Sequence, residues 1–291
     1  MIDALASVAS QTWTSWEAIV VDDGSSDATP TVLAAAAERD RRVRVVRHDS
    51  PQGGSAARNS GIALAKGELL AFLDDDDQWL PTKLAEQVNY LGSHPDVGAV
   101  SCWHAIDDGV SRESLLFRGP TVVNYDDLCW DDFCGSASFC LWRRSAFREE
   151  PRFDPDLPSA QDWDVWLKCA RQASVAVVPQ ILCRYSAHHG PRITASSPAR
   201  VEGRQRVVER YGASMTEECR AYHEARIALL GDDSGLSEAK VLAGLLAHRR
   251  PQAAFALTSA AIAGRLGDRA GDPARGARQL HRTIRRYRRA R

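Results

Sequence analysis

Four consecutive carboxylates, Asp74, Asp75, Asp76 and Asp77, directly follow a short apolar run at residues 69–73. Such a run with an abrupt polar end predicts a buried strand of a parallel sheet. Ligands in open α/β sheets bind just beyond the carboxyl ends of the strands. Because adjacent like charges repel, and because oxygen ligands suit hard cations, these residues predict a site for Mg²⁺ or Mn²⁺. The alternative is a solvated acidic loop.

A second pair of carboxylates, Asp22 and Asp23, follows the strand-like run at residues 16–21. The glycine and small polar residues behind the pair predict a tight turn and a cap for a helix over residues 29–40. A binding role and a turn-forming role for these aspartates are both compatible with this pattern.

The segment at residues 53–59 contains a glycine pair and leads into a helix predicted to reach Ala65 and to be closed by Gly67. Glycines before a helix let a ligand approach backbone N–H groups, and the helix N-terminus favours anions. Arg58 adds a fixed positive charge. The pattern is neither a P-loop nor GxGxxG, so a plain loop-to-helix junction is the alternative.

Asp162 stands at the start of an amphipathic helix predicted over residues 162–172. The dipole at the helix N-terminus favours the ionised carboxylate, and a positioned carboxylate can act as a general base. The alternative is an ordinary N-cap. We expect Trp163 and Trp166, on the same helix, to lie in the core.

The elements that must position these residues alternate along the first hundred residues. Further strands are predicted at residues 43–46 and 97–102, with a helix at 83–91. This order predicts an α/β fold with parallel strands and right-handed crossovers. Beyond an irregular stretch at 107–132 come segments predicted as strands at 138–142, 175–178 and 181–185. A polar loop with His188 and His189 follows, and the chain after residue 198 is predicted to be helical.

The composition is that of a soluble globular protein, with 291 residues, 44% hydrophobic and 26% charged residues, and a net charge of −1. A charge this close to neutral argues against a general nucleic-acid binder. No apolar stretch is long enough to span a membrane. The seven cysteines contain no CxxC pair, so they predict reduced, buried thiols and a cytoplasmic location.

The C-terminal residues 274–291 are strongly basic. Leu280, Ile284 and Tyr287 lie at helical spacing among arginines, which predicts an amphipathic helix peripheral to the inner membrane face. A solvated tail is the alternative.

Four runs, IVVDDGSSDAT, GGSAARNSG, LAFLDDDDQWLP and QDWDVWL, occur in one order along residues 2–194. Together they resemble family 2 glycosyltransferases. The resemblance implies a GT-A fold, which is a Rossmann-like, mostly parallel mixed sheet flanked by helices, here with a helical C-terminal extension. It divides the chain into a nucleotide-sugar half at 1–100, an acceptor half at 101–195 and a helical region at 196–291.

The resemblance also implies roles for matching positions. The nucleotide base is contacted at the end of the second strand, the DxD pattern falls in the acidic turn, and the catalytic base opens the later helix. A histidine near the metal or phosphates follows the last strands. Asp22 and Asp23 match the contact to the nucleotide base, and Arg58 matches the arginine near the nucleotide. In the acidic turn, the DxD pattern falls on Asp74 and Asp76, with Asp76 as the metal ligand and Asp75 near the ribose. Asp162 matches the catalytic base, and His188 matches the histidine near the metal or phosphates.

The activity implied by the resemblance is inverting transfer of a sugar from a UDP- or dTDP-sugar, with Mn²⁺ or Mg²⁺, to a glycan, lipid-linked or small-molecule hydroxyl acceptor. One catalytic base and no carboxylate nucleophile correspond to single displacement. The alternatives are an inactive nucleotide-sugar-binding or scaffold relative, and a phosphohydrolase that releases phosphate without an acceptor.

Two positions depart from the family pattern. Gln161 stands where a Glu is usual, and the chain begins in the helix that should follow a first strand of the type VSVIIPTYN. Without that strand we expect unpaired backbone groups and exposed apolar faces. The hypotheses are a start upstream of Met1 or an inactive, truncated fragment.

Overall fold

The computed structural model describes residues 1–107, 115–117, 121–147, 152–186 and 197–231. His188, His189 and the basic C-terminal segment lie outside these ranges. Among the helices that are described, none is both long and apolar enough to cross a membrane.

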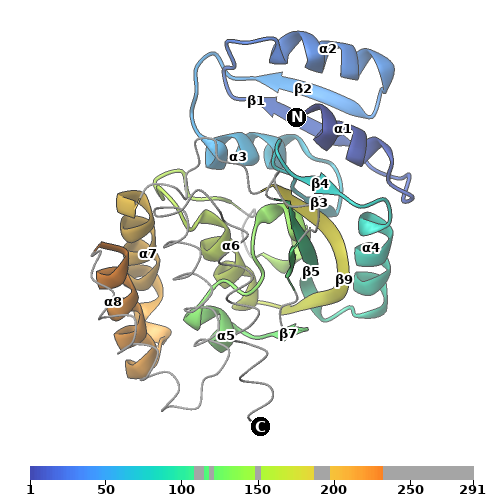
Figure 1. The fold of residues 1–291 in the computed structure, drawn as a ribbon. Helices are drawn as coiled ribbons and strands as arrows, with labels where there is room; N and C mark the ends of the chain where they lie inside the picture. The colour runs from blue at the N-terminus through green and yellow to red at the C-terminus, as the bar shows by residue number, and fades with distance from the viewer. Residues whose placement is uncertain (108–114, 118–120, 148–151, 187–196, 232–291) are drawn as a thin grey trace.

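The strands form two separate sheets (Figure 1). The smaller sheet pairs β1 (Ala18–Asp22) with β2 (Val43–Arg47) in parallel, with Ala18 opposite Val43. The larger sheet has the order β3-β8-β5-β9-β4, with β6 on β5 and β7 on β9. Its strands are β3 (Leu69–Ala71), β4 (Gln78–Trp79), β5 (Val97–Asp107), β6 (Leu115–Phe117), β7 (Val122–Val123), β8 (Leu141–Arg143) and β9 (Ser174–Ser186).

Strand direction differs in part from the prediction. Among the described strands, only β1 with β2 and β5 with β9 are parallel. The run at 69–73, predicted as a parallel strand, forms the short β3, and its partner β8 is antiparallel. A buried apolar run shows that both faces of a strand are covered, but it does not report the direction of the neighbouring strand. The fold is therefore a mixed α/β fold with fewer parallel pairs than expected.

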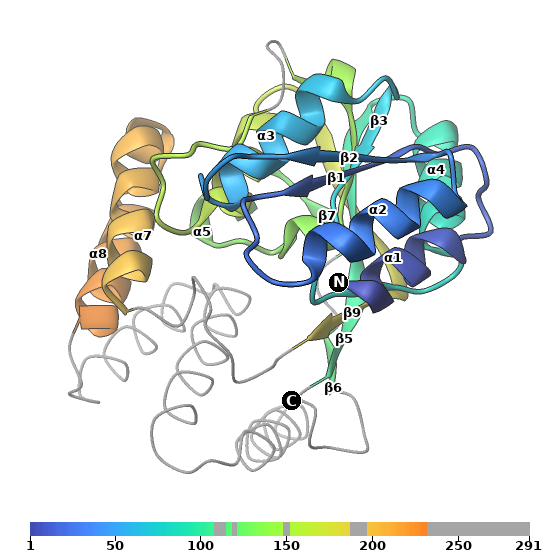
Figure 2. The same cartoon turned by 90° about the horizontal axis from the view of Figure 1, so that it is seen from above.

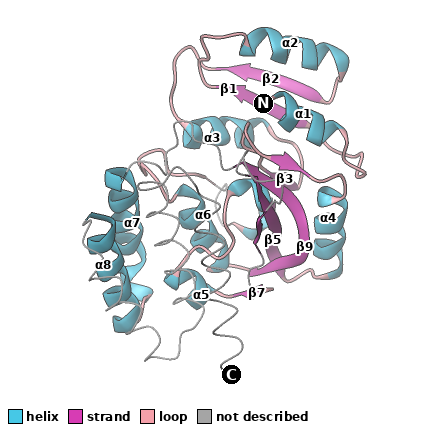
Figure 3. Cartoon of the chain, viewed as in Figure 1, coloured by secondary structure: helices cyan, strands magenta, loops and turns pink. Residues whose placement is uncertain are grey.

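Helices flank the larger sheet on both sides (Figure 3). α4 covers one side, α5 and α6 cover the other, and α7 and α8 lie outside α6. Figure 2 shows α4 and the α7–α8 pair on opposite sides of the molecule from above. α2 packs on β2, and α3 packs on β1. The helices are α1 (Ile2–Ala9), α2 (Thr29–Arg39), α3 (Gly54–Leu64), α4 (Lys83–Ser93), α5 (Tyr125–Trp130), α6 (Gln161–Ala170), α7 (Ser197–Tyr211) and α8 (Glu217–Gly231). α3 is followed by Ala65 as its C-cap, not by the predicted Gly67.

The core confirms the predicted burial of the aromatic side chains. Trp163 and Trp166 on α6 are buried, and the Trp166 ring meets Trp142 of β8 edge to face with centroids 5.6 Å apart. All seven cysteines are buried and free of disulfides, as expected. Because the Trp166 ring packs directly on Trp142 of β8, α6 is held against the larger sheet.

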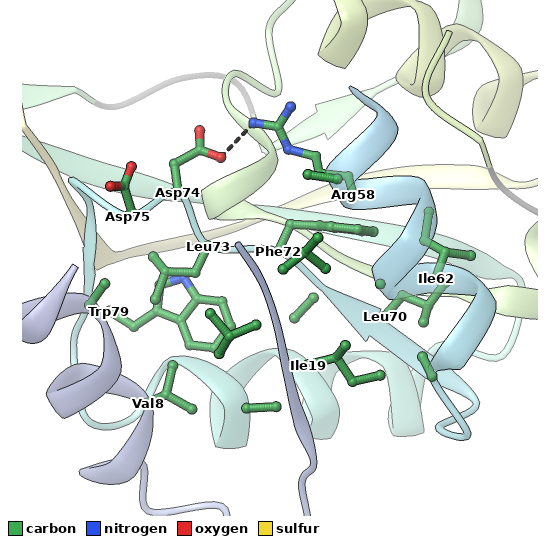
Figure 4. Close-up of a pocket in the computed structure, with 18 of the residues that line it drawn as sticks. Val8, Ile19, Arg58, Ile62, Leu70, Phe72, Leu73, Asp74, Asp75 and Trp79 are labelled. Atoms are coloured by element: carbon green, nitrogen blue, oxygen red, sulfur yellow. Dashed lines mark hydrogen bonds and ion pairs between the residues drawn. The ribbon is translucent and has the colours of Figure 1, made fainter. Parts of the chain in front are cut away.

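The two sheets do not join. No described strand lies between β1 and β3, and their facing edges border a cleft of about 1450 Å³. Apolar side chains from both strands line it, including Ile19 and Leu70 (Figure 4). Residues of α1, including Leu5 and Val8, also line this cleft.

Candidate active site

Side chains from four elements meet at this cleft. Those predicted from sequence come from the end of β1, from α3, from the turn after β3 and from the start of α6. The cleft is lined by Asp22, Asp23, Arg58, Asp74, Asp75, Asp76 and Asp162. The structure therefore brings together every predicted site residue that it describes.

Arg58 connects α3 to the acidic turn (Figure 4). Its guanidinium pairs with Asp74, with Nη2 2.5 Å from Oδ1. The backbone N–H of Asp74 donates to the Ser138 hydroxyl at 3.0 Å, which fixes the turn against the larger sheet. Burial opposes the charge on Arg58, but attraction to Asp74 and Asp162 outweighs it and raises the arginine's pKa. The group is a permanent cation inside the cleft.

Asp162 is not the N-cap of α6, so the capping alternative is wrong. The N-cap is Ala160, and no side chain caps this helix end. The Oδ1 atom of Asp162 is buried and has no hydrogen-bond partner in the described part of the chain. Burial raises the pKa of Asp162 to about 6, although Arg58 opposes the shift. A carboxyl with this pKa can gain and lose a proton near neutral pH.

The two carboxylates at the end of β1 accept hydrogen bonds from the backbone of nearby loops. Asp22 accepts the backbone N–H of Ser25 at 2.9 Å and pairs with Arg47. Asp23 accepts the backbone N–H groups of Gln52 at 2.9 Å and Gly53 at 2.7 Å. The turn interpretation is thus confirmed. Asp23 also holds the glycine loop at the start of α3, a role that the sequence did not suggest.

The four aspartates of the acidic turn have different environments. Asp75 and Asp76 are exposed, while Asp77 is buried. Asp77 accepts the backbone N–H of Ser186 at 3.0 Å, and burial raises its pKa to about 7. Asp77 therefore joins the turn to the end of β9 and does not face the cleft.

The described residues alone do not assemble a metal cage. Within them, no group of three or more His, Cys, Asp or Glu side chains is placed to hold an ion. Mg²⁺ commonly binds through one or two carboxylates together with substrate phosphates. The exposed oxygens at the cleft rim, from Asp75 and Asp76, fit that kind of site.

Asp132 lines the cleft and was missed from the sequence. It accepts the backbone N–H of Gly135 at 2.7 Å and of Cys134 at 3.1 Å. Burial and then the charge of Asp162 raise its pKa to about 8. The aspartate three residues before a glycine indicates a turn, but no sequence signal shows that this turn faces Asp162.

The chain resembles known proteins over most of its described part. The family model described as glycosyl transferase family 2 matches residues 1–150. TuaG of Bacillus subtilis, named a putative teichuronic acid biosynthesis glycosyltransferase, is 27% identical over 175 residues, covering 60% of this chain and 68% of TuaG. WcaA of Escherichia coli K12, named a putative colanic acid biosynthesis glycosyl transferase, is 28% identical over 214 residues, covering 69% of this chain and 73% of WcaA.

Solved structures share the fold at lower identity. TarS of S. aureus (residues 1–349, in complex with UDP-GlcNAc) superposes with a TM-score of 0.63 at 17% identity, covering 98% of this chain and 87% of that one. The mannosyltransferase PcManGT from Pyrobaculum calidifontis, in complex with GDP-Man and Mn²⁺, has a TM-score of 0.55 at 22% identity, covering 90% and 76%. At these identities the likeness shows the GT-A fold.

Proposed function

The chain belongs to glycosyl transferase family 2 and is a glycosyltransferase, and we propose that it transfers a sugar from a UDP- or dTDP-sugar to a hydroxyl acceptor with inversion. The observation that carries the proposal is the buried, unpartnered Oδ1 of Asp162, in the same cleft as Arg58 and the acidic turn. A base, a fixed cation and oxygen ligands for a metal are the three groups that this reaction needs.

Asp162 is the general base of the proposed reaction. The acceptor hydroxyl must lose its proton as it attacks the sugar, and a carboxylate with a pKa of about 6 is largely ionised at pH 7 and still basic. Single displacement with inversion requires one such base and no carboxylate nucleophile, and membership of the family supports this outcome. The acceptor is a glycan, lipid-linked or small-molecule hydroxyl and approaches from the 101–195 side.

Arg58 and the acidic turn hold the donor. The diphosphate gains charge as it leaves, and the Arg58 cation offsets part of that charge. Asp76, with His188, would hold Mn²⁺ or Mg²⁺, which supplies Lewis-acid stabilisation of the same leaving group. Asp75 contacts the ribose, while Asp22 and Asp23 hold the loop against which the nucleotide base packs. The solved TarS complex with UDP-GlcNAc and the Mn²⁺ complex of PcManGT support a nucleotide sugar and a divalent cation.

The first test is calorimetric binding of UDP, dTDP and GDP, with and without Mn²⁺. We expect one nucleotide to bind in a Mn²⁺-dependent way, and Asp76→Ala to abolish that dependence. UDP release from UDP-GlcNAc or UDP-glucose in the presence of candidate acceptors then tests turnover, with Asp162→Asn as the base-deficient variant. Binding without turnover for every donor and acceptor would support the scaffold alternative, and phosphate release without an acceptor would support a phosphohydrolase.

A further inference from the structure

Helix α7 touches the segment that leads into α6 without an intervening side chain. A Cβ placed on Gly203 of α7 would lie 2.3 Å from the Ser159 hydroxyl and 2.5 Å from the Ser159 carbonyl oxygen. No other residue type fits there unless the Ser159 backbone moves. The Ser159 hydroxyl also donates to the carbonyl of Ala199, one turn earlier on α7, at 2.9 Å. Ser159 is therefore held by the helix backbone itself.

Ser159 is three residues before Asp162. Between them, Ala160 has φ of 62°, in the left-handed region that alanine seldom adopts. Such a conformation persists where the surroundings impose it. It turns the chain into α6, so it sets the direction in which Asp162 leaves the backbone. The contact at Gly203 acts on the residue immediately before this turn.

Side chains of α7 also contact the residues just after Asp162. Asp164 is fully buried, and it accepts from Arg210 Nη1 at 2.7 Å and from the Tyr211 hydroxyl at 2.8 Å. The Arg204 guanidinium lies 4.8 Å from the centroid of the Trp163 ring. α7 thus contacts the chain on both sides of the proposed base.

A buried ion network ties the same helix to the loop opposite Asp162. Asp131 pairs with Arg204 of α7 at 3.1 Å and with Arg226 of α8 at 2.5 Å. The next residue is Asp132, which lines the cleft. The α7–α8 pair therefore contacts residues adjacent in sequence to Asp132 and close to Asp162, two carboxylates that line the cleft.

We infer that α7 is a positioning element for Asp162, and that Gly203 is the positioning residue through which it sets the start of α6. The inference rests on the proposed function, because it takes Asp162 as the base. It gives the helical C-terminal region a role in the reaction although no described residue of α7 lines the cleft.

The test compares Gly203→Ala with Gly92→Ala, a helical glycine of α4 whose added Cβ would meet nothing within 4 Å. Three properties are measured: UDP binding with Mn²⁺, kcat for UDP release from the UDP-sugar as a function of pH, and hydrogen exchange of residues 157–163. For Gly203→Ala we expect nucleotide affinity within about twofold of wild type, kcat reduced at least about tenfold with a displaced acidic limb, and faster exchange. Gly92→Ala should match wild type throughout.

A second variant, Ser159→Ala, removes the hydroxyl contact to Ala199 without adding bulk, and it should lower kcat by a smaller factor with unchanged KM. Wild-type kcat, pH limb and exchange in Gly203→Ala would overturn the inference. So would a loss of nucleotide binding together with kcat, because that result indicates general disruption. Full turnover in Asp162→Asn would instead refute the proposed base, while the exchange measurement still reports whether α7 holds residues 157–163.

Discussion

The pKa of Asp162 predicts the pH dependence of the reaction. Burial moves this pKa from 3.8 to about 6. A shift of about two units corresponds to about 3 kcal/mol of added cost for ionising the carboxyl. If the ionised form is the base, roughly half of the enzyme is active at pH 6 and about a tenth at pH 5. Below pH 6, kcat/KM should fall about tenfold for each pH unit.

The assay is UDP release from the UDP-sugar between pH 4.5 and 9, with Mn²⁺ and an acceptor. Asp162→Asn keeps the size of the side chain and removes the titrating group. It should lower the rate by about 10²- to 10⁴-fold, the usual contribution of general base catalysis. The acidic limb should disappear from the remaining activity. Nucleotide binding, measured in parallel, should stay close to that of the wild type.

Arg58 provides a second test of the same reasoning. Its charge opposes the upward shift of the Asp162 pKa. Replacing it with Gln should therefore move the acidic limb to higher pH, while Lys, which keeps the charge, should leave the limb nearly in place. The reasoning fails if the limb of the wild type lies near pH 4, or if it persists in Asp162→Asn. Asp77 and Asp132 also have raised pKa values, so persistence would point to one of them.

Three further outcomes can be checked on the purified protein. Asp131→Asn leaves its two arginine partners buried without a countercharge and should lower the free energy of unfolding in urea by about 3–5 kcal/mol; a change below about 1 kcal/mol would contradict a structural role for the network. Because Asp132 has a folded pKa of about 8 against 3.8, it is protonated at low pH in both states and costs stability as pH rises from about 4 to 8. Asp132→Asn should accordingly raise the melting temperature at pH 8 but not at pH 4, and equal gains at both would refute the assigned pKa. All seven cysteines are buried, so native protein should resist a thiol reagent at pH 7.5 and react fully in urea; rapid labelling of the native protein would contradict their burial.

Local patterns predicted the elements that carry the site well. The helices α2 and α4 and the strands β1 and β2 lie within about two residues of their expected positions, because apolar spacing and polar ends mark them. The segment predicted as two strands forms the single β9, since the register shift opposite Cys102 and Trp103 accommodates Pro179 within the strand. Proline at a bulge loses no ladder hydrogen bond, a fact that sequence alone does not reveal.

Long-range contacts account for what the sequence could not predict. α5 was missed within an irregular stretch, although Asn124 and Asp127 form a capping box at its start. The burial of Asp77 and of Asp132 depends on strands and helices remote in sequence. No local pattern therefore distinguishes the buried Asp77 from the three aspartates before it. The contact between Gly203 and Ser159 has no local signature, because a helical glycine is only weak evidence of close packing.

The break between the two sheets has a consequence for cooperativity. No described backbone ladder crosses from β1 to β3, so side-chain packing and connecting segments hold the β1–β2 layer to the rest. We expect this layer to form its own unfolding unit, with amide exchange in β2 faster than in β5. Asp23 belongs to that layer, and Asp74 belongs to the other. A nucleotide that contacts both Asp23 and Asp74 would bind only when both units are folded, and it would therefore couple their unfolding. Thermal unfolding should then change from two steps without the donor to one step with it.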